Sequence, residues 1–272
     1  MKEKKVFEMI LFSSFAAIII LLALVPYIGY ITFIPGFASL TIIHIPVIIG
    51  LFVFGFKKSL GLFALFGVTS FFVALWRPTG VVDYAFQNPL ISILPRVIAG
   101  VLAYFAMVGL KKLLTIKKYG QTLVFSSVAM VVVLFLYFAG RGLAIQLKWD
   151  LNIITPVMLF LSVTIIGIFY HQIEKMTDND VFYVPATFII ASLIHSLVVL
   201  FFLATLTVNL PLDITANTLE MVRTTVPNYF GTTGQALIYG SLGTSSLIEA
   251  LLAVVIGTPI VIALKNYQKR DI

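Results

Sequence analysis

Cysteine is absent from this chain of 272 residues, and charged side chains make up only 11% of it. Without cysteine, the chain has no disulfide, no thiolate metal site and no thiol chemistry. A soluble domain carries about 25% charged residues, so this chain has too few charges to cover a surface that faces water. These two shortages exclude a disulfide scaffold and an ordinary soluble domain.

Motifs for catalysis and for nucleotide binding are missing too. The sequence has no P-loop, no GxSxG motif and no paired Asp-rich motif. Its three histidines follow neither the HExxH nor the HxxxH spacing, so we expect no metal site. The chain is therefore expected not to be an enzyme, to need no cofactor and not to hydrolyse ATP itself.

Hydrophobic residues, in contrast, make up 60% of the chain and gather in long runs. Several runs approach or exceed the roughly 20 residues that a helix needs to span a bilayer. The sequence therefore predicts an all-α polytopic membrane protein with a single transmembrane domain over residues 1–272. The longest loop, about 207–235, is expected to hold a short interfacial helix. Eight apolar segments are expected, at about 9–29, 40–56, 59–76, 89–110, 121–147, 153–172, 183–206 and 236–264.

Basic residues form short clusters between these segments, which is typical of membrane topology and not of nucleic-acid binding. With eight helices, thirteen lysines and arginines fall on the side of the N-terminus and three on the other side. Because cytoplasmic loops are enriched in these residues, we expect a multi-pass protein of the bacterial cell membrane with both termini cytoplasmic. The asymmetry requires an even number of crossings but does not distinguish eight from six. The thirteen are Lys2, Lys4, Lys5, Lys57, Lys58, Lys111, Lys112, Lys117, Lys118, Lys175, Lys265, Lys269 and Arg270, and the three are Arg77, Lys148 and Arg223.

Charges inside the apolar segments are limited to Arg96, Arg141 and Glu249. A charge near the bilayer centre costs about 2.5–3.5 kcal/mol, so such a residue usually faces a cavity or a partner. Glu249 shares a helix face with Ser245, and two roles stay open with equal weight: a structural carboxyl between helices, and a substrate contact. Arg96 either extends outwards or binds a ligand, whereas Arg141 lies close enough to the membrane surface for its side chain to reach out.

Two histidines, His44 and His195, also fall inside apolar segments. His195 shares a helix face with Ser192 and Ser196, and lipid does not tolerate so polar a face, so we expect it to point into the bundle. Whether this face meets a ligand or another helix stays open. In the third segment a stripe of small residues is expected to let a neighbouring helix pack closely: Ala64, Gly67, Ser70 and Ala74.

Three motifs follow one another over about 26–110. They are Pro35-Gly36 with Thr41 and His44-Ile-Pro-Val-Ile-Ile-Gly50, then Phe66-Gly67 with Ser70, then Pro89-Leu90 with Ser92, Leu94-Pro95-Arg96 and Gly100. In this order they resemble the substrate-binding S component of energy-coupling factor (ECF) transporters, the bacterial vitamin importers. The branch in question includes binders of pantothenate, pyridoxine and cobalamin.

The resemblance implies a six-helix bundle that captures a small water-soluble vitamin from outside. Such a subunit works with a transmembrane coupling subunit and two ABC ATPases, so ATP would be used by the partners. Eight segments are predicted, which is two more than the six helices of an S component. Residues 121–172 would then be an inserted transmembrane hairpin that supplies the additional pair. Besides these protein partners, the chain is expected to contact membrane lipid and no nucleic acid.

The resemblance also implies which residues meet the substrate. The loop around Pro35, Gly36 and Thr41 would cover it, and His195-Ser196 stands where such proteins often carry Asn-Thr. Ser245 stands where they often carry an Asn four residues before the Glu. The implied substrate-binding set is Pro35, Gly36, Thr41, His44, Asn88, Arg96, His195, Ser196, Ser245 and Glu249, and the implied docking motif for the coupling subunit is Ala16, Ala17 and Ala23.

Arg96 suits a carboxylate, which favours an anionic vitamin such as pantothenate. The alternative is a stand-alone secondary transporter or channel for a small solute. Such a protein would need a site for a coupling ion, for which only Glu249 qualifies, and the missing inverted repeat counts against it.

Overall fold

The structure is a computed structural model that describes residues 2–26, 28–31, 40–78, 80–116, 118–174, 182–212, 220–243 and 245–270. Within these ranges, seven helical stretches are long and apolar enough to cross a membrane, which confirms the all-α polytopic membrane fold. They are α1 (Lys2–Leu24), α3 (Phe56–Trp76), α5 and α6 (Pro89–Ser92 and Leu94–Leu113), α7 (Gly120–Leu147), α8 (Leu151–Glu174), α9 (Tyr183–Thr205), and a C-terminal series of α11 (Thr232–Gly243), α12 (Ser245–Leu252), the π-helical turn η2 (Ala253–Gly257) and α13 (Thr258–Arg270).

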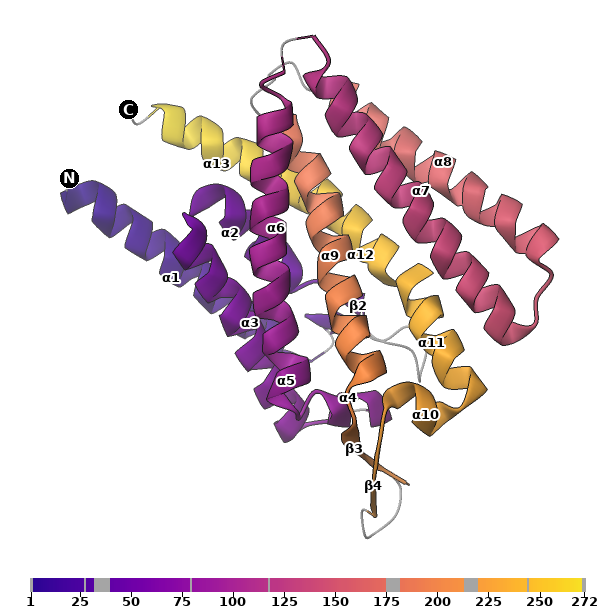
Figure 1. Cartoon of the computed structure of the whole chain (residues 1–272). Coiled ribbons are helices and arrows are strands. Elements are labelled where there is room, and N and C mark those ends of the chain that lie inside the picture. The colour runs from indigo at the N-terminus through magenta and orange to yellow at the C-terminus, as the bar shows by residue number, and fades with distance from the viewer. Residues whose placement is uncertain are drawn as a thin grey trace.

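Helix α9 lies at the centre of the bundle. In its most apolar stretch 72% of the residues are buried, compared with 17% in α1 and 11% in α8. Figure 1 shows α1 and α8 at opposite edges of the molecule. The two edge helices therefore expose most of their apolar surface, as helices that face lipid do, while α9 is surrounded by protein.

The second predicted segment, 40–56, is shorter as a helix than the sequence predicted. Strand β1 (Tyr30–Ile31) pairs antiparallel with β2 (Leu40–Thr41), and α2 runs only from His44 to Val53. Ten helical residues span about 15 Å, half of the roughly 30 Å hydrocarbon core. Pro46 explains the late start, because proline is tolerated only in the first turn of a helix. The eight predicted helices are thus seven long ones and one short, buried one among the described residues.

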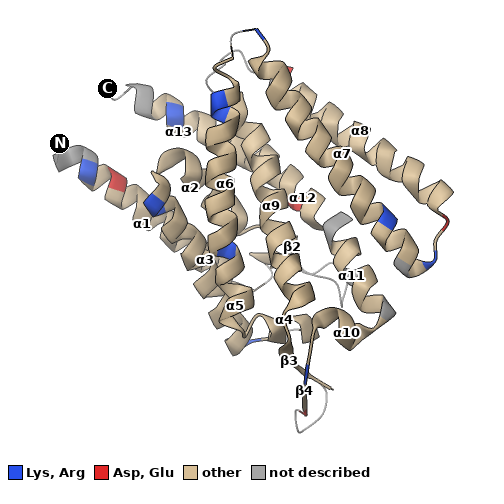
Figure 2. Cartoon of the chain, in the orientation of Figure 1, with Lys and Arg blue, Asp and Glu red and all other residues tan. Residues whose placement is uncertain are grey.

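Both ends of the described chain lie on the same side of the molecule (Figure 1), where the rings of Phe7 and Tyr267 stack with centroids 6.1 Å apart. Figure 2 shows lysine and arginine mainly at helix ends and in connections. We call this side the basic end, since the lysines there whose side chains the structure describes are Lys5, Lys57, Lys58, Lys111, Lys112, Lys118 and Lys265. Seven crossings alone would place the two ends on opposite sides, so an even number requires the short helix α2, with the strands before it, to count as the eighth crossing. Which end is cytoplasmic stays a prediction.

The opposite end holds the short elements. They are α4 (Val81–Ala85), the antiparallel pair β3 (Val208–Pro211) and β4 (Met221–Thr224), and α10 (Val226–Phe230). Helix α10 confirms the short helix expected in the loop 207–235, whereas the β3–β4 hairpin was not predicted. A separate small core of apolar residues, including Ile91, Leu203 and Leu210, joins these elements to the bundle.

Helices α7 and α8 form an antiparallel hairpin along one side of the bundle (Figure 1). Helix α7 packs against α11, where Gly142 allows close approach: a Cβ there would lie 2.4 Å from a ring carbon of Tyr239. The two helices coincide with the predicted segments 121–147 and 153–172. That this hairpin is an insertion into a six-helix bundle stays a prediction.

Candidate functional site

The Glu249 carboxylate connects three parts of the chain in the interior of the bundle. The side chain is 5% exposed. Its Oε1 accepts a hydrogen bond from the backbone N–H of Thr41 at 2.6 Å, and its Oε2 accepts one from the Ser196 hydroxyl at 3.1 Å. The carboxylate therefore joins α12 to the extended segment β2 and to the central helix α9.

The extended backbone around Thr41 lies at the depth of the membrane-crossing helices. Glu249 lies near the middle of the apolar stretch Thr233–Tyr267, so Thr41 lies deep in the bundle with it. Backbone that is not helical is tolerated at this depth only where it is buried in protein or lines a cavity. The segment before α2 thus breaks helical regularity beside a buried carboxylate, which is typical of binding sites in transport proteins.

Two histidines stack beside this carboxylate. The His44 Nδ1 bonds to the carbonyl oxygen of Thr41 at 2.5 Å. Because a carbonyl oxygen only accepts, Nδ1 carries the proton in this bond. The His195 ring lies parallel to that of His44, with centroids 6.0 Å apart and an interplanar angle of 6°. The pair joins α2 to α9.

The Leu94-Pro95-Arg96 sequence itself determines how the Arg96 side chain is held. The helix breaks between α5 and α6 at Ile93, just before Pro95. In a continuous helix the carbonyl of Ile91 would accept from residue 95, but proline has no N–H. The Arg96 side chain takes that place, and its Nη1 donates to the Ile91 carbonyl at 2.8 Å. The Leu-Pro-Arg sequence therefore turns the guanidinium back into the bundle.

Aromatic rings surround the guanidinium. Its central carbon lies 5.4 Å from the ring centroid of Phe66 and 4.9 Å from that of Phe86. Phe66 in turn lies 5.4 Å from the ring of His195, so the arginine belongs to the same interior region as the histidine pair. Arg96 is 4% exposed, and in the part of the chain that the structure describes no carboxylate forms an ion pair with it.

A tyrosine closes one side of this region. The Tyr30 hydroxyl and the Ser70 hydroxyl are 2.5 Å apart, and Tyr30 stands opposite Thr41 in the β1–β2 pair. Helix α3 approaches the α5–α6 break closely at Gly67, where a Cβ would lie 2.7 Å from the Cα of Ile93. This confirms the packing role predicted for the small-residue stripe of the third segment.

We define the polar cluster as Thr41, His44, Ser92, Arg96, Ser192, His195, Ser196 and Glu249, all of them buried. Eight buried side-chain atoms of the described residues lack a hydrogen-bond partner, and six of them belong to this cluster. Nearly all buried polar atoms in native proteins are hydrogen-bonded, so such a concentration makes the cluster the candidate binding site. The six are His44 Nε2, Ser92 Oγ, Arg96 Nε, Ser192 Oγ and both ring nitrogens of His195.

The structure brings together six of the predicted substrate-binding residues and leaves others apart. Asn88 accepts a hydrogen bond from the Leu90 N–H at 3.0 Å and caps α5, which accounts for its presence structurally. Ser245 begins α12, one turn before Glu249, and is partly exposed. Pro35 and Gly36 lie outside the described residues. The six in the cluster are Thr41, His44, Arg96, His195, Ser196 and Glu249.

The predicted docking motif on α1 is divided between two environments. Ala23 is fully buried, Ala16 packs against the core, and Ala17 is exposed. A coupling subunit that approached α1 from the lipid side would therefore meet Ala17 and not Ala23. The docking role stays a prediction.

Sequence reasoning missed several members of the region. Tyr30 and Phe86 lie in short connecting segments, where periodicity gives no signal. Ser92 and Ser192 could have been included, because each shares a helix face with a residue already singled out, Arg96 and His195 respectively. Phe66 stood in a quoted motif, but the contact of its ring with Arg96 depends on how α3 meets α6.

Chemically, the cluster offers one guanidinium, one carboxyl group, two imidazoles and several hydroxyls inside apolar walls. Among the described residues no three histidine, aspartate or glutamate side chains gather closely enough to hold a metal ion. Such a set can bind a small polar molecule that carries an anionic group and hydrogen-bonding groups. No protein-family model matches the chain, and the comparison with curated proteins finds none that is significantly similar in sequence.

Proposed function

We propose that this chain is the substrate-binding subunit of an ATP-driven vitamin importer of the ECF type. It binds a small, water-soluble, anionic vitamin in the polar cluster. The cluster extends from the middle of the bundle towards the end opposite the basic end, where α5, α6 and the short elements meet. If the basic end is cytoplasmic, as the charge asymmetry predicts, the ligand enters from outside.

The observation that carries the proposal is the buried Arg96, with which no carboxylate among the described residues forms an ion pair at close range. A buried charge is costly unless it is paired, and a guanidinium recognises a carboxylate through two parallel hydrogen bonds. Arg96 Nε has no protein partner. A ligand carboxylate would therefore complete the site, which supports an anionic vitamin of the pantothenate type over a neutral one.

Two further features support an importer subunit that depends on partners. The motifs over about 26–110 resemble those of S components in their order, and four members of the polar cluster are positions in these motifs: Thr41, His44, Ser92 and Arg96. The chain has no nucleotide-binding motif. Energy for concentrative uptake would then come from ABC ATPases joined through a coupling subunit.

Binding by the purified protein in lipid nanodiscs tests the ligand class. We expect saturable binding of a carboxylate-bearing vitamin from a panel that includes pantothenate. Its alcohol analogue, in which CH₂OH replaces the carboxylate, should bind at least about tenfold more weakly, because it cannot pair with Arg96. Equal affinity for both compounds, or binding of none of the panel, contradicts an anionic vitamin site.

Uptake into proteoliposomes tests the dependence on partners. The chain alone should bind ligand without accumulating it, whether or not a proton or sodium gradient is applied. Accumulation by the chain alone under such a gradient would show a secondary transporter and would overturn the importer-subunit proposal. Recovery of ABC ATPases with the tagged protein from its native membrane would support it.

A further inference from the structure

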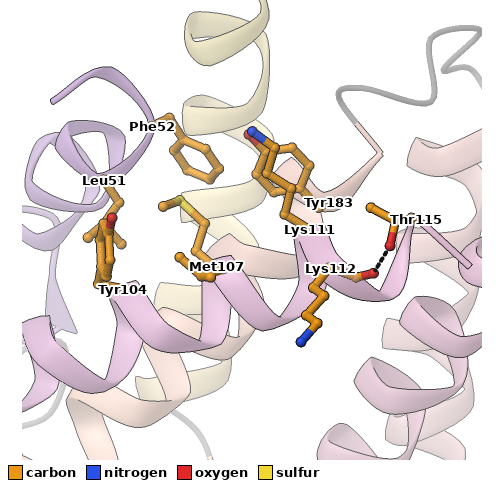
Figure 3. A pocket seen from close by; sticks show the side chains of 9 residues that line it. Leu51, Phe52, Tyr104, Met107, Lys111, Lys112, Thr115 and Tyr183 are labelled. Atoms are coloured by element: carbon orange, nitrogen blue, oxygen red, sulfur yellow. Dashed lines mark hydrogen bonds between the residues drawn. The ribbon is translucent and has the colours of Figure 1, made fainter. Parts of the chain in front are cut away.

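A pocket separate from the polar cluster opens at the basic end, beside the end of α2 opposite His44. Its volume is about 530 Å³. Its walls come from the last residues of α2, from the second half of α6 and from the start of α9, and Figure 3 shows their side chains. The polar cluster uses the other end of α2, so this pocket is not part of the proposed vitamin site.

The lining changes from apolar to cationic along α6. Tyr104, Met107 and Lys111 recur at three- and four-residue spacing, which places them on one stripe of α6, and Thr115 lines the pocket just beyond the end of the helix. Leu51 of α2, which also lines the pocket, is buried. Lysine follows at the helix end, and Lys111 and Tyr183 both line the pocket there (Figure 3).

Positive charge dominates the mouth of the pocket. Lys111 and Lys112 are both exposed, and none of the nine lining residues is acidic. Lys265 adds a third ammonium group next to the pocket: it donates to the Tyr183 hydroxyl at 2.7 Å and lies 5.8 Å from the ring centroid of Phe52. An occupant should therefore combine an apolar body with an anionic head.

The wall towards the outside of the bundle is the lipid-facing side of α6. Val108, which lines the pocket, is 43% exposed, and Phe105 beside it is 61% exposed. An apolar chain can enter from the bilayer along this face without crossing water. Basic pockets between helices near a membrane surface bind anionic lipid headgroups by this combination of chain and charge.

We propose that this pocket binds one anionic phospholipid. An acyl chain lies against Tyr104, Met107 and Val108, and the phosphate lies at the mouth of the pocket, where Lys111 and Lys112 supply positive charge. The proposal does not depend on the identity of the vitamin, because the two sites share no residue.

Native mass spectrometry of the protein released from nanodiscs tests the proposed lipid site. The discs contain phosphatidylcholine with a minor share of phosphatidylglycerol. We expect one retained phosphatidylglycerol in preference to phosphatidylcholine, and a fall of roughly five- to thirtyfold in its retention in Lys111→Gln/Lys112→Gln. The matched control, Lys57→Gln/Lys118→Gln, removes the same charge from the same end of the molecule and should change retention less than about twofold.

A second pair of variants tests whether the pocket binds the acyl chain of the lipid. Met107→Trp fills the pocket without changing charge and should also lower retention, whereas Phe105→Trp on the exposed side of the same helix should not. Glycerol phosphate, a free headgroup, should not compete with the lipid. If size-exclusion chromatography shows that Lys111→Gln/Lys112→Gln is misfolded, Lys111→Arg/Lys112→Arg is used in its place. This variant keeps the charge and should keep the lipid.

Three results would overturn the proposal. Equal loss in both double-lysine variants would show attraction by the general charge of this end. Retention that survives Met107→Trp, or that glycerol phosphate abolishes, would show a phosphate site without a lipid chain. Unchanged retention in Lys111→Gln/Lys112→Gln, with loss of copurifying ATPase subunits, would assign the surface to a protein partner.

Discussion

The backbone N–H of Thr41 donates to the Glu249 carboxylate at 2.6 Å, although 208 positions separate the two residues in the sequence. The bond ties the strand that precedes α2 to the last membrane-crossing stretch. A strand inside a helical bundle has amide groups that no helix satisfies, and the carboxylate supplies an acceptor for one of them. The position of Thr41, and with it the first turn of α2, therefore depends on Glu249.

Replacement of Glu249 by alanine should destabilise the protein. It removes the acceptor of the Thr41 N–H and of the Ser196 hydroxyl, and an unsatisfied buried donor costs about 1–3 kcal/mol. Thermal unfolding in detergent should show a clear fall in melting temperature. Glu8→Ala is the control, because Glu8 forms an exposed ion pair with Lys58, which is worth about 0–1 kcal/mol.

The same Glu249→Ala variant separates two roles of the carboxylate. If Glu249 contacts the ligand, affinity of the folded variant should fall by about ten- to a hundredfold as well, since a charged hydrogen bond contributes roughly 1.5–3 kcal/mol. Unchanged affinity together with lost stability would remove Glu249 from the binding site and leave it as a link between helices.

Replacement of Arg96 by glutamine should weaken binding of a carboxylate ligand by about ten- to a hundredfold. Glutamine lacks the charge, and a lysine at this position would lack the two-pronged geometry, so Arg96→Lys should recover only part of the affinity. Arg141→Gln is the matched control, because Arg141 lies exposed on α7 and bonds to Tyr137. Isothermal titration with the vitamin and with its alcohol analogue gives the comparison. An equal loss of affinity for both compounds would contradict a contact between Arg96 and the carboxylate.

Most of the fold could be predicted from the sequence because long apolar runs have one stable form in a bilayer. The limits of α7 and α9 agree with the predicted segments within a few residues. The helix that differs most in length from its predicted segment is α2, where the run 40–56 is apolar enough for a full span. There the early Pro46 and the hydrogen bond from Thr41 to Glu249 favour a strand followed by a short helix.

The site was predictable only in part. Rare polar residues in apolar helices pointed to His44, His195, Arg96 and Glu249, and the structure places all four in one interior region. The contacts between them depend on tertiary packing, such as the distance from Glu249 to β2. Asn88 was predicted as a ligand contact from the sequence alone. In the structure it caps the start of α5, just before Pro89.

Gly67→Ala should disturb the site through packing alone. The added methyl carbon would lie 2.7 Å from the Ile93 Cα and 3.0 Å from the Ser92 carbonyl oxygen, so α3 must move away from the α5–α6 break. We expect a lower melting temperature and weaker ligand binding together. Gly61→Ala on the same helix is the control, since the nearest atom lies at 3.8 Å, and it should stabilise by about 0.5–1 kcal/mol. Equal melting temperatures for the two variants would show that this contact is not tight.

The α7–α8 hairpin should cross the membrane completely. Helix α7 has 28 residues, so it spans about 42 Å, which is more than the roughly 30 Å of hydrocarbon. The chain has no cysteine, so single replacements at Lys118 and Lys148, before and after α7, can be labelled without background. In intact cells an impermeant maleimide should label Lys148→Cys only, and Lys118→Cys should react only after permeabilisation, as Lys57→Cys at the same basic end should. If Lys118→Cys and Lys148→Cys react from the same side, α7 does not span the membrane, and the positions of both termini relative to the cytoplasm must be assigned again.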